Sequence, residues 1–115
     1  MRLLRSTGFV VVVVIAMMFA TASGTAHADE PVPMKARTLA ERGRRAHDRG
    51  EYAKAIAAFK EAYVLAPSDA LLFNLAQSYR LHGDCEDAAM MYKRFLASEP
   101  SADAAAIAGA HLASV

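Results

Sequence analysis

The sequence has few of the residue patterns on which small enzymes and metal sites depend. Its single cysteine, Cys85, excludes a disulfide bond within the chain. It has no glycine-rich phosphate-binding loop, no serine-nucleophile motif and no paired catalytic carboxylates. His47, His82 and His111 lie in different segments, without the paired His or Cys ligands of a zinc site. We therefore expect no enzymatic activity, no metal and no other cofactor.

The sequence has only one long hydrophobic run, and that run lies near the N-terminus. The stretch "FVVVVVIAMMFA" follows Arg2 and Arg5 and precedes Ala26-His27-Ala28. A basic start, an apolar core and an A-x-A site are typical of a secretory signal peptide, here residues 1–28. Cleavage after Ala28 leaves 87 residues in a periplasmic or secreted protein with no membrane span. The alternative is an uncleaved membrane anchor, although a spanning helix needs about 20 apolar residues.

Neither sign of charge dominates the exported part. Without Arg2 and Arg5 it keeps 11 of the 13 Lys and Arg residues and all 12 acidic residues, a net charge of −1. This balance gives no electrostatic reason for binding nucleic acid or an anionic membrane surface. We expect a partner of another class.

The exported part repeats itself with a period of 33 residues. Residues 36–68 align with residues 69–101 and share small, large and turn-forming residues at matching places. The identical pairs are Leu39/Leu72, Gly50/Gly83, Ala55/Ala88, Lys60/Lys93, Pro67/Pro100 and Ser68/Ser101. A fixed period with repeated glycine and proline indicates a helical repeat more than a generic four-helix bundle, which needs neither.

Each unit is predicted to be a pair of helices. Apolar residues recur at three- and four-residue spacing, a glycine breaks the chain at mid-unit, and a proline ends it. In the second unit Asp69 and Asp84 occupy the places of N-caps. The predicted organisation is a signal peptide (1–28), a linker (29–35), two repeats (36–68 and 69–101) and a C-terminal capping helix (102–115). Gly109 lies 33 residues beyond Ala76, so this last helix continues the register without a partner helix.

Two stretches, "GEYAKAIAAFKEAYVLAP" and "LLFNLAQSYRLHGDCEDAAMMYKRFLASEP", resemble tetratricopeptide repeats. The family pattern of a small residue in the first helix, a glycine and an acid at the turn, alanine and an aromatic in the second helix, and a closing proline is met in both units. The first unit departs from it at Ala46, where tyrosine is usual. The second departs at Cys85, where tyrosine is usual, and at Phe95, where alanine is usual. We expect an exported bacterial protein of this family.

The resemblance implies an all-α stack of helical hairpins with a concave, partner-binding groove lined by the first helix of each repeat. The expected groove residues in this sequence are Arg37, Arg44, Phe73, Asn74, Gln77 and Arg80. Arginines there can face carboxylates, and amides can bond an extended backbone. We expect an adaptor or scaffold that binds a protein or peptide partner. The alternative is a self-assembling envelope component, such as a homodimer, with the last helix as its interface.

The stretch "RLHGDCEDA" contains His82, Asp84 and Cys85 close together and therefore suggests a thiol active site. Its alignment with the first unit argues otherwise, because Gly83, Asp84 and Ala88 match Gly50, Glu51 and Ala55 at a turn without a thiol. We interpret the stretch as a turn and expect Cys85 to be a partly buried, inert thiol.

Overall fold

The computed structural model describes residues 31–115, and the predicted signal peptide, residues 1–28, lies outside them. Within this range the chain forms five α-helices and no strand, which confirms the predicted all-α class. The helices are α1 (Met34–Asp48), α2 (Tyr52–Leu65), α3 (Asp69–His82), α4 (Cys85–Ala97) and α5 (Ala102–Ala113). Helix α1 begins two residues earlier than the first predicted repeat, inside the segment predicted as linker.

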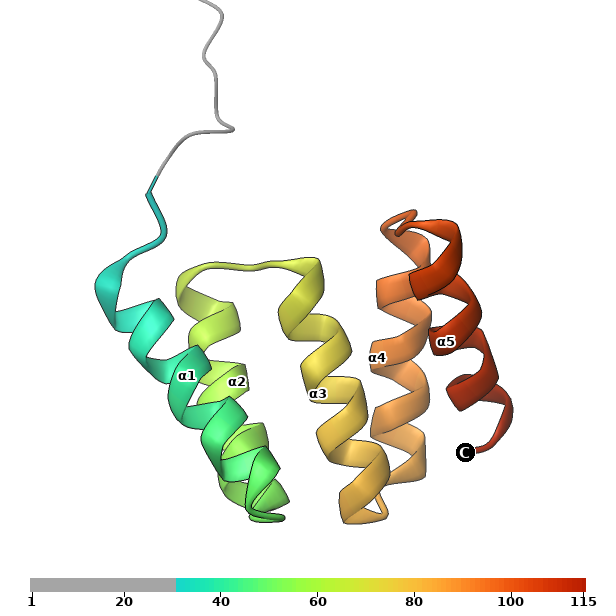
Figure 1. Ribbon diagram of the computed structural model, residues 1–115, viewed down its shortest axis with the longest axis horizontal. Helices are drawn as coiled ribbons and strands as arrows, with labels where there is room; N and C mark the ends of the chain where they lie inside the picture. The colour runs from blue at the N-terminus through green and yellow to red at the C-terminus, as the bar shows by residue number, and fades with distance from the viewer. Residues whose placement is uncertain (1–30) are drawn as a thin grey trace, which may run out of the picture.

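The helices stand side by side in chain order and alternate in direction (Figure 1). Each packs against the next, and α1 also contacts α3. Helices α1, α3 and α5 therefore run in one direction and are the first helices of the successive units. Their shared side is the surface on which the binding residues were predicted.

Glycine makes the two tight turns within the helix pairs, as its repetition predicts. Gly50 has φ 74° and Gly83 has φ 94°, both in the left-handed region that side chains disfavour. At the second turn the amide of Gly83 donates to the carbonyl of Arg80, and the amide of Asp84 donates to that of Tyr79. These bonds satisfy carbonyls at the end of α3 and reverse the chain within two residues.

The helix starts differ in detail from the prediction. Helix α3 is capped by Ser68, whose hydroxyl accepts the amide of Leu71 at 3.2 Å, so the prediction of Asp69 as the cap is wrong by one residue. Asp84 does precede α4, but its side chain makes no capping bond. Ser101 caps α5 by accepting the amide of Ala104.

Two hydrophobic clusters form the core. The first joins α1, α2 and α3, and the second joins α3, α4 and α5. The first is centred on Phe59, which is 1% exposed, and the second on Tyr92, which is fully buried. Tyr63, Tyr79 and Met91 are partly buried and pack against both clusters. Burial raises the pKa of Tyr79, and the nearby carboxylates of Asp87 and Asp84 raise it further. These three shared side chains join the two clusters into one core.

Candidate functional site

A hollow of about 170 Å³ lies between α1 and α3, lined by polar side chains above an aromatic ring. Its walls are polar because the outward positions of the two helices meet there, and its floor is the edge of Phe59 from the core. The lining residues are Arg44, His47, Asp48, Phe59, Asn74 and Gln77. The hollow can therefore offer charge, amide hydrogen bonds and one apolar contact to a ligand.

A second hollow, also of about 170 Å³, continues along the same two helices toward their N-termini. It is mainly apolar, because alanines face each other across it and the chain around Pro67 closes its end. Its lining residues are Val32, Ala36, Arg37, Ala40, Arg44, Ala66, Pro67, Ser68, Ala70, Leu71 and Asn74. Arg44 and Asn74 line both hollows, so we describe the two together as the α1/α3 groove.

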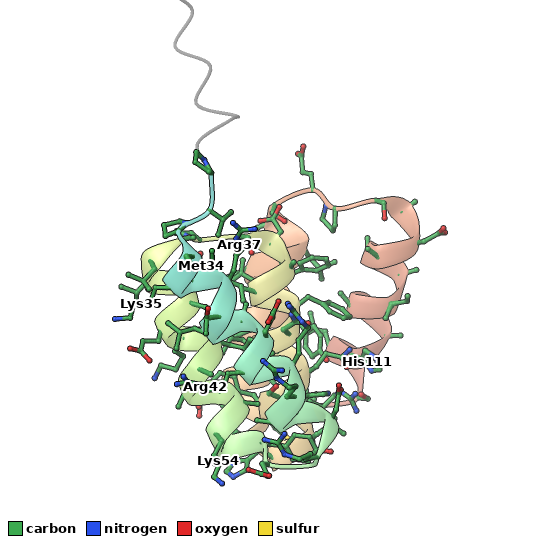
Figure 2. All side chains as sticks on the ribbon, turned by 60° about the vertical axis from the view of Figure 1, so that its left-hand side comes forward. Met34, Lys35, Arg37, Arg42, Lys54 and His111 are labelled. Carbon is green, nitrogen blue, oxygen red and sulfur yellow. The ribbon has the colours of Figure 1, made fainter. Side chains whose placement is uncertain are left out.

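Four of the six predicted binding residues line this groove: Arg37, Arg44, Asn74 and Gln77. Helical periodicity places Arg37 and Arg44 two turns apart on one side of α1, with Lys35 and Arg42 on the other. Figure 2 shows this separation, with Arg37 toward α3 and Lys35 and Arg42 away from it. Neither Arg37 nor Arg44 forms an ion pair within residues 31–115, so both guanidinium groups can take an acidic ligand.

The other two predicted residues, Phe73 and Arg80, do not line either hollow. The Phe73 ring is half-buried and packs against Phe95 and Tyr92, with ring centroids 5.2 and 6.1 Å away. Arg80 donates from Nε to the Tyr92 hydroxyl at 3.2 Å and from Nη2 to the Gln77 amide oxygen at 3.0 Å. Both side chains have structural contacts to α4, which the helical spacing alone could not reveal.

His47, which lines the first hollow, is paired with a buried serine. His47 Nδ1 lies 2.9 Å from Ser78 Oγ, between α1 and α3. These are the residue types of a base and a nucleophile, but Ser78 has no exposed area, so no substrate can reach its oxygen. The bond instead satisfies a buried hydroxyl and fixes the spacing of the two helices. His47 and Asp48 line the first hollow but were not among the predicted binding residues.

Three other cations of the first helix pair, Arg45, Arg49 and Lys54, have acidic partners. Glu51 bonds Arg49 and Lys54, each at 2.8 Å, and Arg45 lies 3.6 Å from Glu41. The side-chain bonds from Lys54 and Arg49 lower the pKa of Glu51 to about 2. Arg49 and Lys54 thus share one carboxylate at the turn, whereas Arg37 and Arg44 have no acidic partner among residues 31–115.

The pKa of Glu51 gives a direct test of this turn. Because the folded pKa is about 2, below the ordinary 4.5, the ion pairs stabilise the fold above pH 4.5. That contribution is lost as the pH falls from 4.5 toward 2. An NMR titration of the side-chain carboxyl carbons should give Glu51 a midpoint near pH 2, and Lys54→Ala should move it upward. A Glu51 midpoint at the ordinary 4.5 would contradict the ion-pair geometry.

The stretch around Cys85 forms a surface turn outside the groove. His82 Nδ1 lies 2.7 Å from the Asp84 carboxylate, and both side chains are over 40% exposed. Cys85 is the first residue of α4 and is exposed, so the prediction of a partly buried thiol is wrong. The shorter cysteine side chain, standing where the first unit has Tyr52, leaves the helix start uncovered. The Asp84 carboxylate bonds the histidine and not the thiol.

Comparison with protein-family models, with curated proteins and with solved structures gives no match. None of the helices in residues 31–115 combines the length and the apolarity that crossing a membrane requires. In the same residues no three or more His, Cys, Asp or Glu side chains gather in a way that could hold a metal ion.

Proposed function

We propose that the chain is an exported, non-catalytic adaptor with a tetratricopeptide-like stack, which binds an extended acidic peptide segment of a protein partner in the α1/α3 groove. The observation that carries this proposal is the continuity of the two hollows through Arg44 and Asn74. One end of the groove is apolar and the other is polar. A segment that carries both apolar and acidic residues matches this lining.

The spacing of the two arginines that line the groove sets the length of the segment. Arg37 and Arg44 are seven residues apart on α1, which corresponds to about 10 Å along a helix. About three residues of extended chain cover that distance. An extended segment exposes its backbone, and the amides of Asn74 and Gln77 on the opposite wall can bond it. The guanidinium groups can form charge-assisted bonds with its carboxylates.

The groove proposal predicts a side-specific loss of binding. Seven-residue peptides selected from a displayed library against the full chain serve as the probe. Arg37→Ala/Arg44→Ala should weaken their binding by about tenfold or more, because charge-assisted bonds contribute about 1.5–3 kcal/mol each. Lys35→Ala/Arg42→Ala is the matched control, since it removes the same charge from the opposite side of α1. It should change binding by less than about threefold, the effect of exposed charges.

Two results would count against the groove. If both double variants weaken binding equally, the peptides respond to the net charge of α1 and not to a site. If neither does, the peptides bind elsewhere. Fluorescence anisotropy at two salt concentrations gives the dissociation constants, and circular dichroism verifies that each variant keeps its helices.

A further inference from the structure

One side of helix α5 lacks a packing contact that the corresponding sides of α1 and α3 both make. In the first unit Gly43 faces the Phe59 ring of the following helix so closely that an added Cβ would lie 2.6 Å from two ring carbons. In the second unit Ala76 and Tyr92 are both fully buried in the same cluster. Thus a small residue of the first helix receives an aromatic ring from the second helix in each unit.

The third copy of this position is Gly109, and no aromatic ring among the described residues packs on it. No atom lies within 4 Å of a Cβ added there. Ala105 and Leu112, which correspond to Leu72 and Tyr79 one period earlier, are only half-buried, and Leu112 borders this side where it packs against the second cluster. Helix α5 is anchored to α4 from its other side, where Ala108 is fully buried and His111 stacks on Tyr92 at 5.8 Å. Figure 2 shows His111 on that inner side of α5.

We infer that the side of α5 formed by Ala105, Gly109 and Leu112 binds a helix of a protein partner that presents alanine and, four residues later, phenylalanine or tyrosine. The two internal helix pairs supply this chemistry, since Ala55 and Phe59 of α2, and Ala88 and Tyr92 of α4, are the residues buried against the first helices. Gly109 is the counterpart of Gly43, the small residue that packs against Phe59 in the α1–α2 pair. A ring can then lie directly on the helix backbone, because no side chain separates them.

A second copy of the chain cannot supply such a helix while it remains folded. The alanine–aromatic stripes of its α2 and α4 are already buried in its own core. Its α5 carries no phenylalanine or tyrosine, and its one ring, His111, is stacked on Tyr92. No helix within residues 31–115 keeps such a stripe free, and the occupant that we propose is a helix of another protein. This surface is distinct from the α1/α3 groove, so the two proposals can fail independently.

A peptide that copies α2 tests the inference on the full chain. The probe is "EYAKAIAAFKEAYVLA", residues 51–66, acetylated and amidated, and its control carries alanine in place of Phe59. NMR titration should show the probe binding with shifts at the amides of Ala105 and Gly109. The control peptide should bind at least tenfold more weakly. Gly109→Gln in the chain should cause the same loss, whereas Ala110→Gln, at an exposed neighbouring position, should change affinity less than twofold.

Three results would overturn the inference. The first is no binding of the probe at 1 mM, and the second is equal binding to the wild-type chain and the Gly109→Gln variant. The third is a set of shifts in α1 in place of α5, which would mean that the probe replaces α2 in its native position. Sedimentation of the chain alone tests whether this side of α5 binds a second copy of the chain. Self-association that Gly109→Gln abolishes would show that it does. Glutamine favours helix and meets open space at position 109, so loss of fold does not confuse the test.

Discussion

Replacing Tyr92 by alanine should lower the free energy of unfolding by about 3–5 kcal/mol, the range for removing a large buried aromatic side chain. Tyr92 is fully buried, its ring lies beside Phe73 and under His111, and its hydroxyl accepts a bond from Arg80. It therefore holds α3, α4 and α5 at once. A domain of this size has about 5–15 kcal/mol of total stability, so the loss should consume much of it.

A second substitution at Tyr92 separates the hydroxyl from the ring, and a substitution at Met90 is the control. Tyr92→Phe keeps the ring and loses only the bond from Arg80, so it should cost about 1 kcal/mol. Met90→Ala, on the half-exposed side of the same helix, should stay within about 0.5 kcal/mol of wild type. Urea unfolding followed by circular dichroism measures all three. A loss below 1 kcal/mol for Tyr92→Ala would mean that the ring is not the centre of the second cluster.

The same substitution, glycine to alanine, should have opposite effects at positions 43 and 109, which are two repeat periods apart. At Gly43 the new Cβ would lie 2.6 Å from the Phe59 ring, and that ring is almost fully buried and cannot turn away. Overpacking of this kind costs about 1–3 kcal/mol. The better helix propensity of alanine returns about 1 kcal/mol, so Gly43→Ala should be destabilising by up to about 2 kcal/mol.

At Gly109 only the propensity term remains, because the added Cβ meets open space. Gly109→Ala should therefore stabilise the chain by up to about 1 kcal/mol. Thermal and urea unfolding of both variants compare the signs directly. In the Gly43→Ala background, Phe59→Leu should cost less than it does in the wild type, because the smaller side chain relieves the contact. Equal effects of the two glycine substitutions would contradict the packing at Phe59.

The sequence predicted the helices and turns well because their causes are local. Gly50 and Gly83 are needed for left-handed backbone, and Pro67 and Pro100 cannot continue a helix, so these residues mark the boundaries in any context. The cap of α3 was missed by one residue because Ser68 and Asp69 are adjacent and equally suited to capping. Local chemistry could not decide between them.

The candidate site was harder to predict because it depends on where long side chains lean. Arg44 and Arg80 both occupy outward positions on first helices, but Arg80 bends to the Tyr92 hydroxyl of the next helix and Arg44 has no such partner. Phe73 lies on the outward side too, and its ring is wide enough to reach Phe95. Helical periodicity gives the direction of the Cα–Cβ bond and not the contact at the end of the side chain.

The single fully buried residue of α5 has a consequence for local unfolding. Opening this helix exposes Ala108 and a few half-buried neighbours, whereas opening α3 exposes residues of both clusters. The amides of α5 should exchange with solvent at a lower free energy than those of α3. A helix bound along Ala105, Gly109 and Leu112 would suppress that opening. Its binding would then be measurable as slower hydrogen exchange of the α5 amides and as greater protease resistance at the C-terminal end.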